Sequence, residues 1–281
     1  MRRTTEGTRD GIQWTLTQQL DDLDYADDLA LLSHSQAQMA NKTKNLERNT
    51  ASIGLRINVE KTKVMKINTR STEPVKVGER EIEEVTSFTY LGSNLDTLGG
   101  TDEDVRIRIS KARTAFNILR KVWRSREIST NTKLKLFNSN VKSVLLYGSE
   151  TWKTSNIIKQ QIQSFINKCL RQILHIFWPN TIRNEELWQQ THQMRPSQEI
   201  KKRKWNWIGH TLRKDENNIP RQALRWNPSG KRKRGRPRNT WRRTWEEEVR
   251  RAGLDWHRLN QEARSRHGWR AFVCGLCTEG S

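Results

Sequence analysis

Apolar and polar positions alternate in short steps along residues 20–32, which read LDDLDYADDLALL. Leu23 and Tyr25 precede the Asp27-Asp28 pair, and a short apolar run follows that pair. Apolar runs of this length, bounded by polar turn residues, are typical of buried strands. Aspartate tolerates the backbone angles of tight turns. The pattern therefore predicts a hairpin of two buried strands with Asp27 and Asp28 at its tip.

The following residues mix one helix with further short strands. Residues 33–52 place Met, Leu and Thr positions near one helical face, with Ser35 in the N-cap position and Gly54 after the end. Residues 75–82 predict a small hairpin with a glycine in its turn. The aromatic and β-branched residues of 86–93 favour another strand.

Beyond the flexible Gly99-Gly100 pair the pattern becomes helical. Apolar residues recur at steps of three and four in three segments, at about 104–123, 129–146 and 154–177. Three successive amphipathic helices predict a small bundle, and its other faces are rich in lysine and arginine. Those faces suit phosphate contacts, or they are simply solvated.

The last hundred residues differ in composition. Residues 185–188 predict a short helix, residues 200–213 interleave basic residues with tryptophan, and two terminal helices are expected after Trp241. Interleaved basic and aromatic side chains can bind phosphates while the rings stack on bases or lie in a core. The predicted fold class is α+β, with antiparallel strands and one helix followed by two helical regions.

Charge narrows the set of partners. Of the 281 residues, 52 are Lys or Arg and 31 are Asp or Glu, which gives a formal charge of +21, and only 33% are hydrophobic. Such an excess repels itself unless a polyanion compensates it, so nucleic acid is the expected partner, with a membrane surface as the alternative. No apolar run of about 18 residues predicts a transmembrane helix, and no apolar segment near the first residues predicts a signal peptide.

The three cysteines are too few for a disulfide framework, which favours an intracellular location. Cys169 falls in an apolar helical stripe and is expected in a core. Cys274 and Cys277 have the spacing of one half of a zinc site, but His257 and His267 lack the spacing of a second half. The two thiols are either zinc ligands or, as expected here, inert.

Two adjacent carboxylates at a hairpin tip repel each other, and a divalent cation is their natural compensation. A solvated turn is the alternative. The string Tyr25-Ala26-Asp27-Asp28 resembles motif C of the reverse transcriptase palm, and residues 11–16 and 20–24 are similar to the lead-in of non-LTR (LINE-type, RTE-like clade) retrotransposon polymerases. The resemblance implies RNA-directed DNA synthesis at two Mg²⁺ ions, with Asp27 as the principal ligand, Asp28 in support and Tyr25 beneath the turn.

Two further segments resemble motifs of the same family. Residues 54–65 resemble motif D, which implies that Lys61 approaches the triphosphate of a deoxynucleotide. The alternative is an ordinary surface lysine. Tyr90, Leu91 and Gly92 resemble the primer grip of motif E, where a tight turn approaches the primer. The alternative is an ordinary edge hairpin.

By this resemblance, residues 1–98 form a partial palm, residues 99–178 a helical thumb and residues 179–281 a basic, Trp-rich nucleic-acid-binding region. The implied partners are an RNA template, a DNA primer or target, and deoxynucleoside triphosphates, with no membrane. The family's motif A carboxylate and fingers are absent from the sequence, so we expect the carboxyl-terminal portion of a longer polymerase, inactive alone. A non-catalytic nucleic-acid-binding remnant of a retroelement is the alternative.

The densest charge run lies between residues 231 and 238. Three interpretations stay open: general nucleic-acid affinity, nuclear import, and preference for the narrow minor groove of AT tracts. A nuclear location is expected. The basic residues of this run are Lys231, Arg232, Lys233, Arg234, Arg236 and Arg238.

Overall fold

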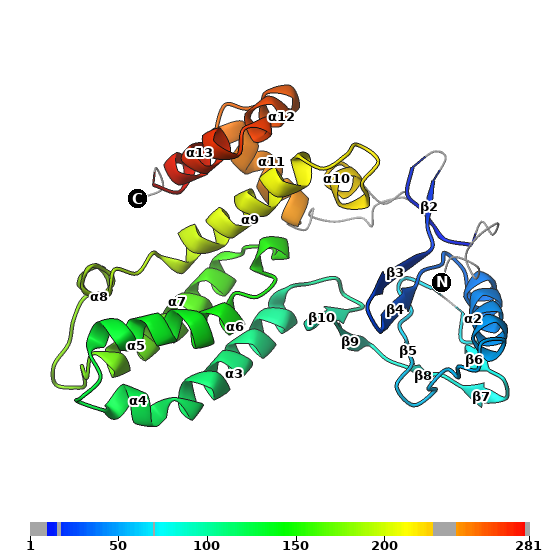
Figure 1. Ribbon diagram of the computed structural model, residues 1–281, viewed down its shortest axis with the longest axis horizontal. Coiled ribbons are helices and arrows are strands. Elements are labelled where there is room, and N and C mark those ends of the chain that lie inside the picture. Colours follow the sequence, from blue (N-terminus) through cyan, green and yellow to red (C-terminus); the bar gives the residue numbers. More distant parts are fainter. Residues whose placement is uncertain (1–9, 16–17, 70, 227–239, 279–281) are drawn as a thin grey trace. The chain divides into compact units, whose positions relative to one another are not determined.

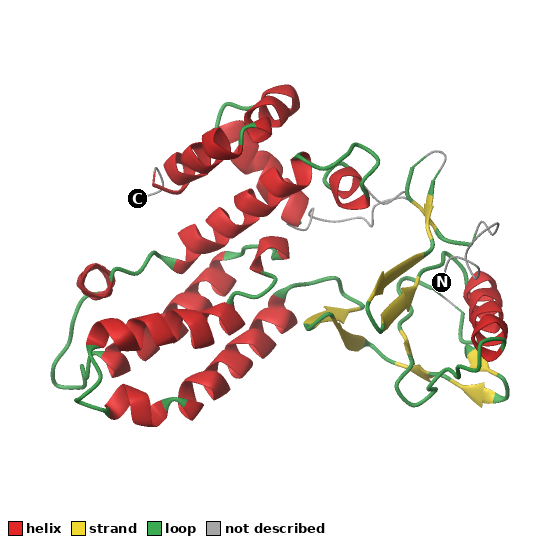
Figure 2. Ribbon diagram, in the orientation of Figure 1, coloured by secondary structure: helices red, strands yellow, loops and turns green. Residues whose placement is uncertain are grey.

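The computed structural model describes residues 10–15, 18–69, 71–226 and 240–278. By contacts, the chain divides into two units, Met1–Gly100 and Thr101–Ser281. All the described strands belong to the first unit, and the second is helical (Figures 1 and 2). The division falls two residues beyond the end of the region 1–98 that the sequence delimited.

The strands of the first unit form five separate two-stranded sheets. Four pairs are antiparallel and the pair of β5 with β8 is parallel. The strands are β1 (Ile12–Gln13), β2 (Gln19–Leu20), β3 (Asp22–Tyr25), β4 (Asp28–Leu31), β5 (Lys63–Val64), β6 (Lys76–Val77), β7 (Arg80–Glu81), β8 (Glu83–Glu84), β9 (Ser87–Tyr90) and β10 (Ser93–Asp96).

Helix α2 (Gln36–Ala51) begins where the sequence predicted. The Ser35 hydroxyl accepts a hydrogen bond from the Gln38 amide, and the Gln38 side chain accepts one from the Ser35 amide, which completes a capping box. The small core of the unit consists of Val75, Val77 and Ile82, with Met39 of α2 packed against it. Gly78 has a φ of 57° in the β6–β7 turn, so the predicted hairpin is confirmed.

The second unit is a succession of helices. They are α3 (Asp102–Ile118), α4 (Arg120–Arg124), α5 (Thr130–Leu136), the π-helix η1 (Phe137–Lys142), α6 (Ser143–Leu145), the 3₁₀ turn η2 (Ser149–Thr151), α7 (Asn156–Ile173), α8 (Asn184–Thr191), α9 (Pro196–Leu212), α10 (Ile219–Ala223), α11 (Trp241–Arg251), α12 (Trp256–Arg264) and α13 (Arg266–Thr278).

Two hydrophobic cores hold these helices together. The first is formed by α3, the α5–η1–α6 segment and α7, and it reaches as far as Leu187 of α8 and Ile200 of α9. The second lies among α9, α11, α12 and α13 and contains Trp205, Trp245 and Trp269. Because α9 contributes to both cores, the predicted regions 99–178 and 179–281 form one unit.

The helix predictions hold in outline and differ in detail. The predicted helix at 104–123 is interrupted at Leu119, which separates α3 from α4. The helix predicted at 129–146 has a central π-helical segment. Residues 240–278, which the structure describes, form three helices, and not two. None of the described helices combines the length and apolar character needed to cross a membrane.

Helix α9 depends on a glycine at its closest contact with α13. A Cβ atom on Gly209 would lie 2.1 Å from Trp269 Nε1, and that indole donates to the Trp205 carbonyl oxygen at 3.0 Å. Alanine at Gly209 would therefore displace a ring that is only 2% exposed.

We predict that Gly209→Ala lowers the free energy of unfolding by about 1–3 kcal/mol, because the clash outweighs the gain in helix propensity. Gly275→Ala in α13 is the matched control, since nothing lies within 4 Å of its Cβ position. Urea unfolding followed by tryptophan fluorescence measures both, because Trp14 is the one tryptophan of 12 outside the helical unit. Equal midpoints for the two variants would contradict the prediction.

Candidate functional site

The acidic hairpin forms as the sequence predicted. Strand β3 pairs with β4 from Asp22↔Leu31 to Tyr25↔Asp28, so Ala26 and Asp27 make the turn and Asp28 begins β4. Ala26 has a φ of 55°, in the left-handed region that residues with a Cβ seldom adopt. Asp27 and Asp28 are both exposed. The turn therefore presents two neighbouring carboxylates to solvent.

A buried lysine fixes the base of this hairpin. The Lys42 ammonium, on α2, donates to the Asp21 carboxylate at 2.6 Å, to the Asp21 carbonyl at 3.1 Å and to the Leu32 carbonyl at 2.8 Å. Lys42 is fully buried, so these three acceptors replace its water. The Leu32 amide also donates to the Asp21 carbonyl at 2.8 Å. One cation thus ties both ends of the hairpin to the helix.

Tyr90 connects this hairpin to the one formed by β9 and β10. Its hydroxyl donates to the Leu23 carbonyl at 3.1 Å. Burial raises the pKa of the Tyr90 phenol, and the negative charges of Asp28 and Asp24 raise it further. The segments that resemble motifs C and E are therefore adjacent in the folded chain.

The turn of the predicted primer grip has the geometry of a tight hairpin. Leu91 and Gly92 have φ values of 48° and 78°, and Tyr90 pairs with Ser93 across the turn. Two successive positive φ angles are typical of the two-residue hairpin turns that match strand twist. Glycine at position 92 adopts its angle without steric cost.

The prediction that the acidic hairpin consists of buried strands is wrong. Leu23, Tyr25 and Leu29 are 39%, 68% and 48% exposed, and Tyr25 is not packed beneath the turn. The physical reason is that β3 and β4 pair only with each other among the described strands. A two-stranded ribbon has too few neighbours to cover both of its faces.

Lys61 has no described contact with Asp27 or Asp28. It is exposed, and its backbone amide donates to Asn58 Oδ1 at 3.1 Å in a turn before β5. Within the described ranges, no hydrogen bond or ion pair joins it to Asp27 or Asp28. Its predicted approach to a triphosphate stays a prediction.

The donor chemistry of the hairpin suits magnesium, which prefers carboxylate oxygens and keeps several waters. Two carboxylates are too few to form a complete metal site. Among the residues that the structure describes, no three Asp, Glu, His or Cys side chains lie together as a metal-binding group. Asp27 and Asp28 alone could therefore supply only part of a magnesium site.

The predicted basic region divides into two cases. Residues 231–238, with Lys231, Arg232, Lys233, Arg234, Arg236 and Arg238, lie outside the described residues. The basic run of α9 is largely structural. There, Lys201 donates to the Leu276 carbonyl at 2.7 Å, and Lys204 donates to Glu248 Oε1 at 2.6 Å.

Two of the three cysteines are buried. Cys169 is buried in the first helical core, and burial raises the pKa of its thiol to about 12. Cys277 is buried, with a raised pKa for the same reason, whereas Cys274 is exposed. A thiol held protonated is a poor nucleophile.

Sequence reasoning found the acidic tip but missed Lys42. The available signal was its position on α2, three residues after Met39 and four before Leu46, on the face that the helix turns toward the core. It also missed the hydroxyl of Tyr90 as a link, because that contact spans 67 residues of sequence.

Comparison with known proteins finds a similarity to a transposon-derived protein. An uncharacterized transposon-derived protein of Caenorhabditis elegans is 25% identical over 243 residues, which cover 82% of this chain and 85% of that protein. Residues 115–147, from the end of α3 to the end of the α5–η1–α6 segment, match a family described as Domain of unknown function (DUF6451). No solved structure matches the chain.

We predict that Lys42→Met destabilises the hairpin by about 2–4 kcal/mol, because it leaves the half-buried Asp21 carboxylate and the Leu32 carbonyl without this donor. Hydrogen exchange of the Leu32 amide measures the free energy of opening. Lys44→Met removes the same charge from an exposed position of the same helix and should change exchange little. The same small effect for both variants would show that Lys42 does not hold the hairpin.

Proposed function

We propose that the chain carries the motif C, D and E segments of a non-LTR retrotransposon reverse transcriptase, an RNA-directed DNA polymerase. The observation that carries this proposal is the β3–β4 hairpin, whose tip exposes Asp27 and Asp28 within the string Tyr-Ala-Asp-Asp. The hydrogen bond from Tyr90 to Leu23 supports the proposal, because it joins the hairpin that resembles motif C to the hairpin that resembles motif E. The transposon-derived relative is consistent with the same class of element.

Each segment has a role in this proposal. Bound magnesium would activate the primer hydroxyl and stabilise the leaving oxygens. Asp27 and Asp28 would hold the ions, and the Leu91-Gly92 turn would let the backbone approach the primer strand. Lys61 would neutralise charge on the triphosphate.

The same geometry argues that the described chain does not complete this chemistry. Two-metal catalysis needs carboxylates that clamp both ions, and no group of three metal-binding side chains occurs among the described residues. The polymerase site would need a further carboxylate beside Asp27 and Asp28.

The second candidate function is nucleic-acid binding without catalysis. The observation that favours it is charge. A formal charge of +21 remains after every Asp and Glu is counted against a Lys or Arg. Template, primer and target are all polyanions, so this function is shared by both candidates. A nuclear location would follow from access to a DNA target and from the basic run at 231–238.

We predict that Mn²⁺, as a paramagnetic substitute for Mg²⁺, broadens the backbone NMR signals of residues 25–29 at millimolar concentration. Two adjacent carboxylates should bind the ion weakly. The double variant Asp27→Asn, Asp28→Asn should abolish the broadening.

The control neutralises Asp102 and Glu103, two acidic residues in the first turn of α3, with Asp102→Asn and Glu103→Gln. That variant should keep the broadening at the hairpin. If the hairpin signals are unaffected by Mn²⁺ in the wild-type chain, the metal-binding role fails.

We also predict that the chain alone extends no DNA primer on an RNA template with Mg²⁺ and deoxynucleotides, because the described residues place no group of three metal-binding side chains at the hairpin. Product is measured on a sequencing gel against the Asp27→Asn variant as background. Robust extension that disappears in Asp27→Asn would refute the prediction and establish a complete site in this chain.

A further inference from the structure

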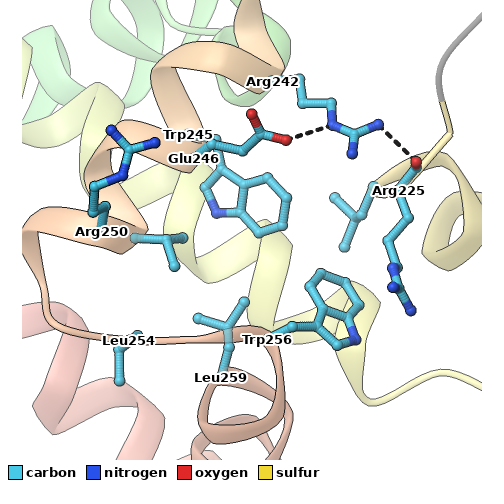
Figure 3. Close-up of a pocket in the computed structure, with 10 residues that line it drawn as sticks. Arg225, Arg242, Trp245, Glu246, Arg250, Leu254, Trp256 and Leu259 are labelled. Atoms are coloured by element: carbon cyan, nitrogen blue, oxygen red, sulfur yellow. Dashed lines mark hydrogen bonds and ion pairs between the residues drawn. The ribbon is translucent and has the colours of Figure 1, made fainter.

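The helical unit contains a pocket of about 320 Å³ beside the second core (Figure 3). Its volume is at the small end of the ~300–1,000 Å³ range of ligand sites, enough for a small ring system. The walls are apolar or aromatic at the base and charged at the rim. The lining residues are Leu224, Arg225, Arg242, Trp245, Glu246, Val249, Arg250, Leu254, Trp256 and Leu259.

Trp245 supplies a buried donor that lacks an acceptor. It is 4% exposed, and among the described residues its indole N–H has no hydrogen-bond partner. The other buried tryptophans each donate at 2.8–3.0 Å: Trp123, Trp152, Trp205 and Trp269. An unpaired buried donor costs free energy, which an acceptor on a ligand would recover.

The second aromatic wall is Trp256, the first residue of α12. Its ring meets that of Trp245 edge to face, with centroids 6.0 Å apart and planes at 81°. Trp256 is only half-buried, so part of its ring is open to a ligand. Two indoles at right angles form a corner, and a planar ring stacked on one of them meets the edge of the other.

The rim carries excess positive charge. The three arginines and one glutamate of the lining give a net +2. Arg242 is already engaged, with Glu246 at 2.8 Å and with the carbonyl oxygens of Arg225 and Trp226. The Arg225 guanidinium lies 4.9 Å from the centre of the Trp256 ring, and no ion pair in the described chain engages Arg225 or Arg250. Figure 3 shows these two arginines on opposite sides of the pocket.

We propose that this pocket binds a nucleobase, with its flanking phosphates held by Arg225 and Arg250. A base offers a π face to Trp256, an acceptor to the Trp245 N–H, and anionic neighbours to the arginines. Every base carries an acceptor, so the site would tolerate different sequences. This inference rests on the proposed nucleic-acid-binding function and deepens it.

The test separates base binding from phosphate binding. It compares the affinity of the full chain for a 12-nucleotide thymidine strand with that for a strand of equal length and charge made of abasic units, by fluorescence anisotropy. At about 150 mM salt the wild-type chain should prefer the thymidine strand by about 5-fold or more, the gain from one stacked base.

Two variants locate the preference. Trp256→Ala should reduce it to about 1-fold and leave the affinity for the abasic strand unchanged. Trp245→Phe keeps an aromatic ring and removes only the N–H, so it should lower the preference by about 2-fold, to a value between those of the wild-type chain and Trp256→Ala. Trp207→Phe, in the same core but outside the pocket, should leave it intact.

Free thymidine monophosphate distinguishes the source of the base. If it competes with the thymidine strand at micromolar concentration, the site takes free nucleotides; if it does not, the site takes a base within a strand. Both outcomes support the pocket, provided that Trp256→Ala removes the effect.

Equal binding of both strands by the wild-type chain would overturn the pocket and leave general nucleic-acid binding in place. A preference unchanged in Trp256→Ala and Trp245→Phe would also overturn it. Failure to bind either strand would overturn the nucleic-acid-binding function itself.

Discussion

The structure depends on how a strongly basic chain buries its own lysines. With 52 basic residues and only 33% hydrophobic content, the cores include cationic side chains. Lys42, Lys133, Lys142 and Lys204 are all buried, and each ammonium donates to carboxylate, amide or carbonyl oxygens. A buried cation is stable only where acceptors replace its water, so each lysine specifies which segments must meet. At Lys42 this requirement holds the acidic hairpin against α2. The position of the exposed carboxylates at the hairpin tip therefore depends on the contacts of Lys42.

The same requirement governs the tryptophan-rich core. Glu248 of α11 accepts from Lys204 at 2.6 Å and from the Trp205 indole at 2.8 Å, so one carboxylate joins α11 to α9. Desolvation lowers the pKa of Lys204, and Glu248 opposes that shift by favouring the charged amine. Most buried donors in proteins are paired with an acceptor. A buried donor without one, such as the Trp245 indole N–H, either lowers the stability of the fold or is available to a ligand.

Local patterns predicted local structure, and distant contacts were out of reach. The capping box at Ser35, the turn at Ala26-Asp27 and the helical stripes depend on neighbours within a few residues, so the sequence contains them. Whether Leu23 and Leu29 are covered depends on which other segments reach the hairpin, and periodicity carries no such information. The link from Tyr90 and the burial of Lys204 arise across 67 and 44 residues, so a lysine in a basic run looks the same whether it faces solvent or a carboxylate.

The residues proposed to act in the two units differ in the sign of their charge. Carboxylates such as Asp27 and Asp28 repel phosphates and can approach them only through a cation, whereas guanidinium groups such as those of Arg225 and Arg250 bind phosphates directly. The proposed binding by the helical unit would therefore not require the acidic hairpin, and an incomplete metal site would leave that affinity intact. It follows that nucleic-acid binding is the property common to an active polymerase and to a catalytically silent derivative. Only the carboxylates at the hairpin tip, and a group that would complete a metal site with them, distinguish the two candidate functions.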